Sequence, residues 1–290
     1  MIRSYVDEDA PQLATIHNRV YAEDVYSADG FRELVARTLD GGGLAWVVDE
    51  IALSGYAMVA AVPGLAGVGD LTGCIAPERQ RRGLGSRLLR YVLEEMRERN
   101  FWQVAHTVTD LDGQAARFLK HYDFFVEHEE WLMVLDDLSR LPAVANDGST
   151  RLQLYSRATA VSLFCRLYEK SFSGLPWDQP FTNAEVTATL ADANNIVFLT
   201  LDGEAIGFAW VSLDGDGKGL IEPLGIVPAY QHKGFGRILL LGVIRELVRR
   251  GAKRVGIGAW RDNGAAIQLY RSVGFRYIKT FTYLAFNLND

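Results

Sequence analysis

Two glycines in the C-terminal half of the chain lie at a position where backbone amides could bind a phosphate group. Residues 231–237, Gln-His-Lys-Gly-Phe-Gly-Arg, follow an apolar strand pattern and precede an apolar helical one. The start of a helix presents unpaired N–H groups at the positive end of its dipole. Gly234 and Gly236 would let an anion approach these amides, and Lys233 and Arg237 add positive charge. The alternative is a plain strand-to-helix turn with glycines for tight packing.

A second copy of this loop occurs 151 residues earlier in the chain. Residues 80–86 read Gln-Arg-Arg-Gly-Leu-Gly-Ser, and a proline lies three residues upstream of each loop, at Pro77 and Pro228. The same spacing relates Phe124 to Phe275. A repeat of this length is a whole domain and is too long for a solenoid unit. We therefore expect two domains, 1–145 and 146–290, with a linker near Ala145.

Glu222 lies on the apolar strand that enters the C-terminal loop and is a candidate general base. A carboxylate on such a strand is expected to have a raised pKa, which suits deprotonation of an amine directly or through water. Strand periodicity predicts that Glu222, Leu224 and Ile226 point to one face of the sheet. A glutamate that forms a structural ion pair is the alternative.

The C-terminal half resembles the GNAT superfamily of acyl-CoA N-acyltransferases in two signature motifs: Pro228-x-x-Gln231-x-x-Gly234-x-Gly236 and Asn263-x-x-Ala266-x-x-Leu269-Tyr270-x-x-x-Gly274-Phe275. The resemblance covers essentially the whole chain as two tandem copies, and it is weaker in the first. It implies an acetyl-CoA-dependent N-acetyltransferase that moves an acetyl group directly to a primary amine of a small molecule. The family usually carries its strand glutamate two residues earlier, where this chain has Leu220.

The resemblance also implies roles for individual residues. Tyr270 occupies the position of the general acid, the amide of Leu224 matches the oxyanion donor, and Pro223 fits the irregular strand that splays the sheet. Acyl-CoA is expected between the strand that ends near Ile226 and the strand over 254–259. The expected cofactor-binding residues are Leu224, Ile226, Gln231, His232, Lys233, Gly234, Phe235, Gly236, Arg237, Asn263 and Tyr270, with Arg81, Arg82, Gly83, Leu84, Gly85 and Ser86 in the first copy.

The first copy lacks the groups that would transfer protons. At the spacing of 151 residues, Glu222 corresponds to Leu71 and Tyr270 to Leu119. Neither leucine can act as an acid or a base, although the loop itself, with Arg87 behind it, is complete. We expect the N-terminal domain to be catalytically silent, either still holding acyl-CoA or serving as a scaffold.

Each half must provide the same set of elements to position these residues. Hydrophobic periodicity predicts helices over 9–18, 31–39, 114–121, 160–170, 184–191, 235–250 and 265–272, with another after the first loop, and strands over 44–49, 51–61, 69–75, 102–108, 129–135, 196–201, 204–211, 220–226, 254–259 and 275–287. Strands that arrive both in hairpins and in β-α-β units indicate an α/β fold with a mixed, mostly antiparallel sheet flanked by helices in each domain.

Composition narrows the class of protein and its partners. The 290 residues are 49% hydrophobic and 23% charged with a net charge of −6, which does not favour nucleic-acid binding. Two cysteines, no metal-ligand spacing and no long apolar run lead us to expect a cytoplasmic protein without a metal or a membrane segment. We expect a monomer or a loose dimer.

The acceptor is unidentified, but the aromatic loop 172–178, Trp210 and Trp260 are candidates for its site or for core packing. A non-catalytic acyl-CoA sensor or partner-binding module, and a scaffold without a ligand, are the rival readings.

Overall fold

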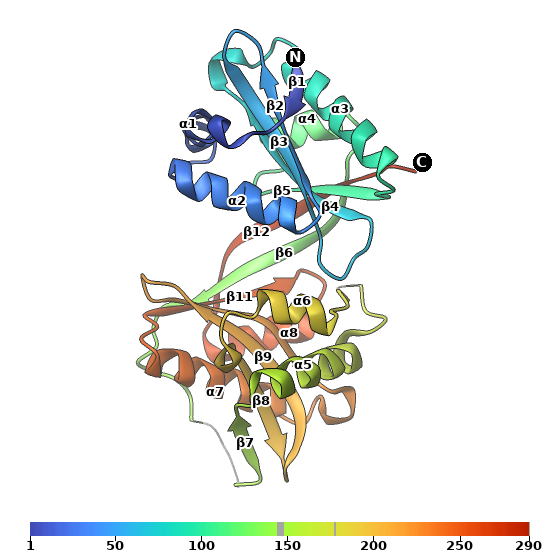
Figure 1. Cartoon of the computed structure of the whole chain (residues 1–290). Helices are drawn as coiled ribbons and strands as arrows, with labels where there is room; N and C mark the ends of the chain where they lie inside the picture. The colour runs from blue at the N-terminus through green and yellow to red at the C-terminus, as the bar shows by residue number, and fades with distance from the viewer. Residues whose placement is uncertain (144–147, 177, 290) are drawn as a thin grey trace. The chain divides into compact units, whose positions relative to one another are not determined.

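The computed structural model describes residues 1–143, 148–176 and 178–289, and the chain forms two compact units (Figure 1). Unit 1 comprises Met1–Glu127 together with the C-terminal segment from Tyr283, and unit 2 comprises His128–Thr282. The predicted linker near Ala145 and the candidate Trp177 lie outside the described residues. Within the described ranges, no helix is long and apolar enough to cross a membrane.

Unit 1 is a mixed sheet with helices on its faces. Its elements are β1 (Ile2–Ser4), α1 (Ala10–Val20), α2 (Ala28–Asp40), β2 (Leu44–Asp49), β3 (Leu53–Ala61), β4 (Val68–Ile75), α3 (Leu84–Glu98), β5 (Gln103–Val108) and α4 (Gln114–Lys120). The strands follow the order β1-β2-β3-β4-β5, antiparallel except for the parallel pair β4 and β5. The apolar positions of α3 that gave the helical pattern, from Leu84 to Met96, are buried.

Unit 2 repeats this plan. Its elements are β7 (Thr150–Gln153), α5 (Arg157–Phe172), α6 (Asn183–Thr189), β8 (Ile196–Leu201), β9 (Glu204–Leu213), β10 (Lys218–Ile226), α7 (Phe235–Arg249), β11 (Arg254–Trp260) and α8 (Gly264–Val273). The strand order is β7-β8-β9-β10-β11, and β10 and β11 form the parallel pair. The predicted mixed, mostly antiparallel sheet is confirmed, and the predicted elements agree with the observed ones to within a few residues. The short edge strands β1 and β7 were not predicted.

The two sequence halves exchange their last strands. Strand β6 (Phe125–Leu135) comes from the N-terminal half, but its residues from Glu130 to Leu135 pair antiparallel with β11 in unit 2. The last strand of the chain, β12 (Arg276–Asn287), begins in unit 2, and its residues from Tyr283 onward belong to unit 1, where β12 is the neighbour of β5. The compact units therefore differ from the segments 1–145 and 146–290 by these strands.

Two apolar clusters cover the two faces of the sheet in unit 2. Helix α7 is apolar around most of its circumference, and its leucines from Leu239 to Leu247 pack with α8 against one face. On the other face, aromatic residues of α5 and β9, including Phe164, Tyr168 and Phe208, form a second buried cluster. These helices hold β10 and β11 rigidly from both sides.

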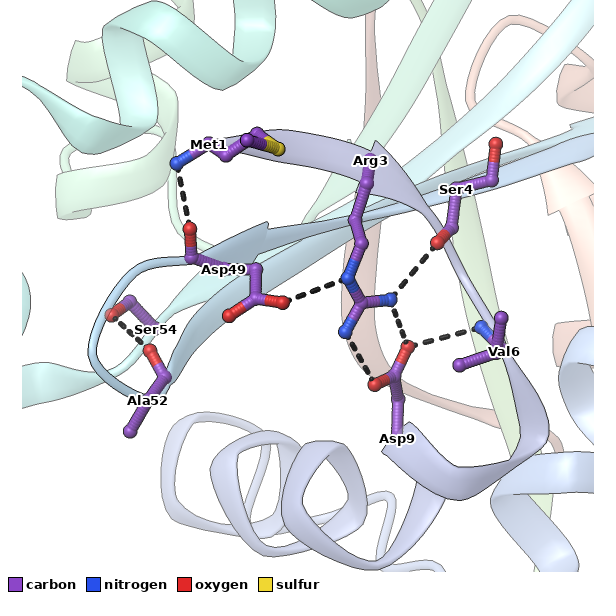
Figure 2. Close-up of polar contacts among 8 residues, drawn as sticks. All are labelled: Met1, Arg3, Ser4, Val6, Asp9, Asp49, Ala52 and Ser54. Atoms are coloured by element: carbon purple, nitrogen blue, oxygen red, sulfur yellow. Dashed lines mark hydrogen bonds and ion pairs between the residues drawn. The ribbon is translucent and has the colours of Figure 1, made fainter.

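The N-terminus of unit 1 is tied down by one arginine (Figure 2). Arg3 on β1 donates to both carboxylate oxygens of Asp9 at 2.8 Å and to Asp49 at 2.8 Å. Burial alone would raise the pKa of Asp9, but the bonds from Arg3 and from the amide of Val6 outweigh it and hold this pKa below its usual range. The pair fixes β1 and the start of α1 against the β2–β3 hairpin.

Replacing Arg3 with alanine is expected to destabilise unit 1 by about 2–3 kcal/mol, because the buried Asp9 carboxylate loses its partner. The Arg3–Asp9 ion pair contributes to the free energy of unfolding only while Asp9 is ionised. The folded-state pKa of Asp9 is lowered, so this stabilisation is present above the unfolded pKa and disappears as the pH falls through the folded value. Denaturant unfolding at pH 7 and pH 3 measures the effect. Arg32→Ala, which removes an exposed pair with Asp29, is the control and should cost less than about 1 kcal/mol.

Candidate active site

The parallel pair β10 and β11 separates partway along its length. Pairing runs from Lys218 opposite Arg254 to Ile221 opposite Ile257 and ends there. At the same place, the register between β10 and β9 shifts between Ile221 and Leu224. This irregularity contains Glu222 and Pro223, as Pro223 led us to expect. The sheet is thus opened between its two central strands, directly beside a carboxylate.

The register shift changes the face on which Glu222 lies. Ile221, Leu224 and Ile226 all belong to the cluster under α7 and α8. Because Ile221 and Leu224 share a face, the adjacent Glu222 points to the opposite one, where its carboxylate oxygens come within 3.4 Å of the position that a Cβ on Gly258 would take. The prediction that Glu222 shares a face with Leu224 and Ile226 is therefore wrong, because simple alternation does not hold across a bulge.

The surroundings of Glu222 favour its protonated form. Burial among protein atoms is the larger cause, and the charge of Glu130 adds to it; together they raise the pKa of Glu222 to about 7. The residue is nevertheless exposed to solvent, as expected for a carboxyl group at the rim of an open site. Because water reaches the carboxyl group in the free protein, an uncharged ligand that covered it would strengthen the upward shift. The raised pKa that the sequence led us to expect is confirmed in direction.

Tyr270 approaches the same opening from helix α8. The residue is 5% exposed, and its ring lies 6.0 Å from that of Phe275. Burial first, and the charge of Glu222 second, raise the pKa of its phenol. Its hydroxyl has no hydrogen-bond partner within the part of the chain that the structure describes. Tyr270 therefore stays protonated at neutral pH and keeps a proton that it can donate.

The loop between β10 and α7 has the conformation of an anion cradle. His232 and Gly234 have positive φ angles of 60° and 86°, and no atom lies within 4 Å of the position that a Cβ on Gly234 would take. Among the described residues, the amides of 232–236 have no acceptor. The side chain of Gln231 donates to the carbonyl of Ile226 at 2.8 Å and so ties the loop to the end of the strand.

Other predicted ligands of the cofactor have structural partners in the free protein. Lys233 donates to the carbonyl of Ala229 at 2.9 Å, and Arg237 donates to the hydroxyl of Ser272 at 2.8 Å. Asn263 caps α8 by accepting the amide of Ala266 at 3.1 Å. Gly236 faces Leu269, and the rings of Phe235 and Tyr230 are 6.2 Å apart. The loop is thus preformed, and the two basic side chains lie at its surface.

Unit 1 has the same loop on a different strand. Gln80 donates to Ile75 at 2.9 Å, and Arg81 and Gly83 have φ angles of 61° and 76°, as in unit 2. Strand β4, however, pairs with β3 from Gly55 opposite Ile75 to Ala61 opposite Gly69 without a register shift. Leu71 and Leu119, at the positions of Glu222 and Tyr270, are buried.

Two side chains close the opening in unit 1. Nδ1 of His106 donates to the carbonyl of Leu71 at 2.7 Å, and the hydroxyl of Tyr21 donates to the carbonyl of Gly73 at 2.7 Å. At the repeat spacing, unit 2 has Ile257 and Phe172 instead, which cannot form these bonds. In unit 1, the carbonyls of Leu71 and Gly73 are therefore paired with side chains that have no counterpart in unit 2.

The sequence of the chain matches the acetyltransferase (GNAT) family over residues 10–124 and 161–275. It is 28% identical to the mycothiol acetyltransferase of Kytococcus sedentarius over 69% of each chain, and 29% identical to that of Acidothermus cellulolyticus over 89% of this chain and 88% of the relative. The crystal structure of a GCN5-related N-acetyltransferase from Sphaerobacter thermophilus has the same fold, with a TM-score of 0.75 at 18% identity over 99% of this chain and 95% of that one. The chain belongs to the GNAT family. It is an N-acetyltransferase that uses acetyl-CoA as its co-substrate.

Sequence reasoning missed two residues at this site, Glu130 and Gly258. Glu130 belongs to the N-terminal half of the sequence, and only the pairing of β6 with β11 brings it next to Glu222. The alternation of Gly256 and Gly258 in an otherwise apolar strand was a visible signal of close approach. Among the described residues, no group of three or more His, Cys, Asp or Glu side chains is arranged to hold a metal ion.

Gly234→Ala is expected to weaken acetyl-CoA binding about tenfold. The added Cβ would stand in the open space beside the loop amides, and a positive φ of 86° strains any side chain by about 1 kcal/mol. Gly83→Ala is the matched control, because Gly83 has the same open surroundings and a φ of 76°. Both variants should lose similar stability in a thermal shift. Calorimetry should show weaker binding at the catalytic site in Gly234→Ala alone; equal loss in both variants would contradict the assignment of this loop.

Proposed function

We propose that unit 2 transfers the acetyl group of acetyl-CoA directly to a primary amine of a small molecule. The observation that carries the proposal is the meeting of two proton-transfer groups at the opening between β10 and β11. Glu222 lies on one face of the sheet and Tyr270 on the other, and the charge of Glu222 influences the pKa of Tyr270. A thioester held in the opening would have a base on one side and an acid on the other.

The residues divide the reaction as follows. The loop amides of 232–236 bind the diphosphate of the co-substrate. Glu222 accepts a proton from the acceptor ammonium, directly or through a water molecule, and the amine nitrogen attacks the thioester carbonyl carbon. The amide of Leu224 stabilises the oxyanion as the tetrahedral intermediate forms. When the C–S bond breaks, the thiolate takes the proton of Tyr270, and the second proton that leaves the nitrogen restores the phenol. The products are the N-acetylated amine and CoA.

Transfer without an acyl-enzyme fits the state of the cysteines. Burial raises the pKa of the Cys165 thiol, and that of the Cys74 thiol to about 12. Both sulfurs are protonated at neutral pH and are therefore poor nucleophiles. Two free thiols also fit a reducing compartment, and we propose the cytoplasm. The two copies within one chain leave no need for a partner subunit, so we propose a monomer or a loose dimer.

The acceptor side of unit 2 is the face on which Glu222 lies. Phe172 and Trp210 are part of the aromatic cluster of this face, which supports a packing role for both. Trp260, in contrast, is partly exposed and stacks on His128 with ring centroids 4.0 Å apart. The named relatives are mycothiol acetyltransferases, and we propose an acceptor of similar size with a primary amine.

We further propose that unit 1 is catalytically silent and keeps its loop residues, from Arg81 to Ser86, as an anion site. The support is the preserved loop conformation together with the leucines at the catalytic positions and the two side chains that close its opening. A double variant, Glu222→Gln with Tyr270→Phe, leaves unit 1 intact. N-acetylation by that variant that fell further when Gly83 was also replaced with alanine would come from unit 1 and would contradict the silent assignment.

Release of the CoA thiol tests the proposed function. Acetyl-CoA is incubated with the full chain and a panel of primary amines, and the acetylated products are identified by mass spectrometry. Amine-dependent thiol release supports the transferase. Tight binding of acetyl-CoA without release on any amine would instead favour the sensor.

A further inference from the structure

Glu130 on β6 and Glu222 on β10 lie on the same face of the sheet, on either side of β11. Glu130 is opposite Trp260 in the β6–β11 register, and Leu132 is opposite Gly258. Side chains at 258 and 260 share one face, and so do their partners across the strand pair. The carboxylate of Glu222 reaches this face over Gly258, 3.4 Å from the position that a Cβ would take. Because Gly258 has no side chain, Glu222 extends across β11 toward Glu130.

The charges that act on Glu222 within the described part of the chain are negative. Glu130 on β6 raises the pKa of Glu222, and no cation contributes to it among the described residues. The charge of Glu222 in turn raises the pKa of Tyr168 on α5 and of Tyr270 on α8, which are both neutral at pH 7. Tyr270 is 5% exposed and has no hydrogen-bond partner in the described part of the chain. The site thus combines two carboxyl groups with the phenol of Tyr270, a residue that is largely buried.

We propose, on the basis of the function stated above, that the ammonium group of the acceptor binds between the carboxylates of Glu130 and Glu222. Glu130 is then a substrate-binding residue that the N-terminal half supplies to the catalytic unit. A cation between the two groups relieves their repulsion and restores the ionised form of Glu222. Glu222 takes one ammonium proton, and Glu130 keeps a hydrogen bond to the nitrogen as it attacks.

The arrangement also selects the class of amine. A carboxylate next to the reacting nitrogen, as in an α-amino acid, would be repelled by both glutamates. The stacked rings of His128 and Trp260, on the same face as Glu130, offer a flat apolar surface for the carbon frame of the acceptor. The preferred acceptor is therefore a cationic primary amine on a ring or chain without a neighbouring carboxylate.

Glu130→Gln tests the proposal in the full chain, with Glu129→Gln as the matched control. Glu129 is adjacent on β6 but points to the other face, where it pairs with Arg261. Initial rates of thiol release are measured with tyramine, glucosamine and tyrosine as acceptors. In Glu130→Gln, the KM for tyramine and glucosamine should rise about tenfold, and the KM for acetyl-CoA should stay unchanged. Wild type should prefer tyramine to tyrosine by a similar factor, and Glu129→Gln should behave as wild type.

Unchanged amine KM values in Glu130→Gln, or an equal rise in both variants, would overturn the proposal. A second measurement does not depend on turnover. Carbon-13 NMR titration of the Glu222 carboxyl group should show a lower pKa in Glu130→Gln than in wild type, whereas Glu129→Gln, which keeps Glu130, should show the wild-type pKa. An unaltered pKa in Glu130→Gln overturns the inference. If no amine is acetylated but the pKa falls, the proposed transfer fails while the coupling of the two carboxyl groups stands.

Discussion

Replacing Tyr270 with phenylalanine is expected to lower kcat about 100-fold while the affinity for acetyl-CoA stays unchanged. General acid catalysis by a positioned side chain contributes about 100- to 10,000-fold to a rate. The hydroxyl of Tyr270 has no partner among the described residues, so its removal breaks no hydrogen bond and keeps the buried ring. Steady-state kinetics gives kcat, calorimetry gives the dissociation constant, and a thermal shift should show an intact fold.

Tyr277→Phe provides the control for this change in the same unit. Tyr277 is exposed, and its hydroxyl is within hydrogen-bond distance of Thr280 at 3.0 Å. The control should keep the wild-type rate. If Tyr270→Phe also kept the wild-type rate, Tyr270 could not be the acid, and a loss of acetyl-CoA affinity equal to the loss of kcat would assign it to binding instead.

Replacing Glu222 with glutamine is expected to lower kcat/KM by about 100-fold or more at pH 8 and to remove the acid limb of the pH profile. A base works in its ionised form. Burial and the charge of Glu130 raise the pKa of Glu222 to about 7, so the wild-type rate should fall as the pH drops below that value. Glutamine has no proton to titrate in this range. The pH profile of kcat/KM from pH 5 to pH 9 distinguishes the two proteins.

Glu169→Gln is the control for this substitution, since Glu169 lies on α5 with its residue exposed to solvent. It should keep both the rate and the acid limb. An acid limb that persisted in Glu222→Gln would show that another group is the base, and the acceptor amine itself would then be the first candidate.

Much of the plan of this protein follows from short segments of its sequence. Local patterns fixed the helices, the strands and the two loops, because the periods of apolar residues and the glycines that need positive φ angles are properties of short segments. The repeat at 151 residues gave the tandem layout and singled out Glu222 and Tyr270, since both are replaced by leucine in the other copy. The match to the GNAT family over both copies confirms that reading of the fold and of the co-substrate.

The geometry of the site, in contrast, depends on contacts between segments that are distant in the sequence. The bulge at Glu222 and Pro223 moved the carboxylate to the face opposite Leu224, and a two-residue alternation cannot foresee a register shift that depends on the neighbouring strand. The exchange of β6 brought Glu130 close to Glu222. The sequence did not predict this exchange, because the apolar pattern of a strand does not specify which sheet it completes. The side chains of His106 and Tyr21 closed the opening in unit 1 through contacts between distant segments, which no local pattern encodes.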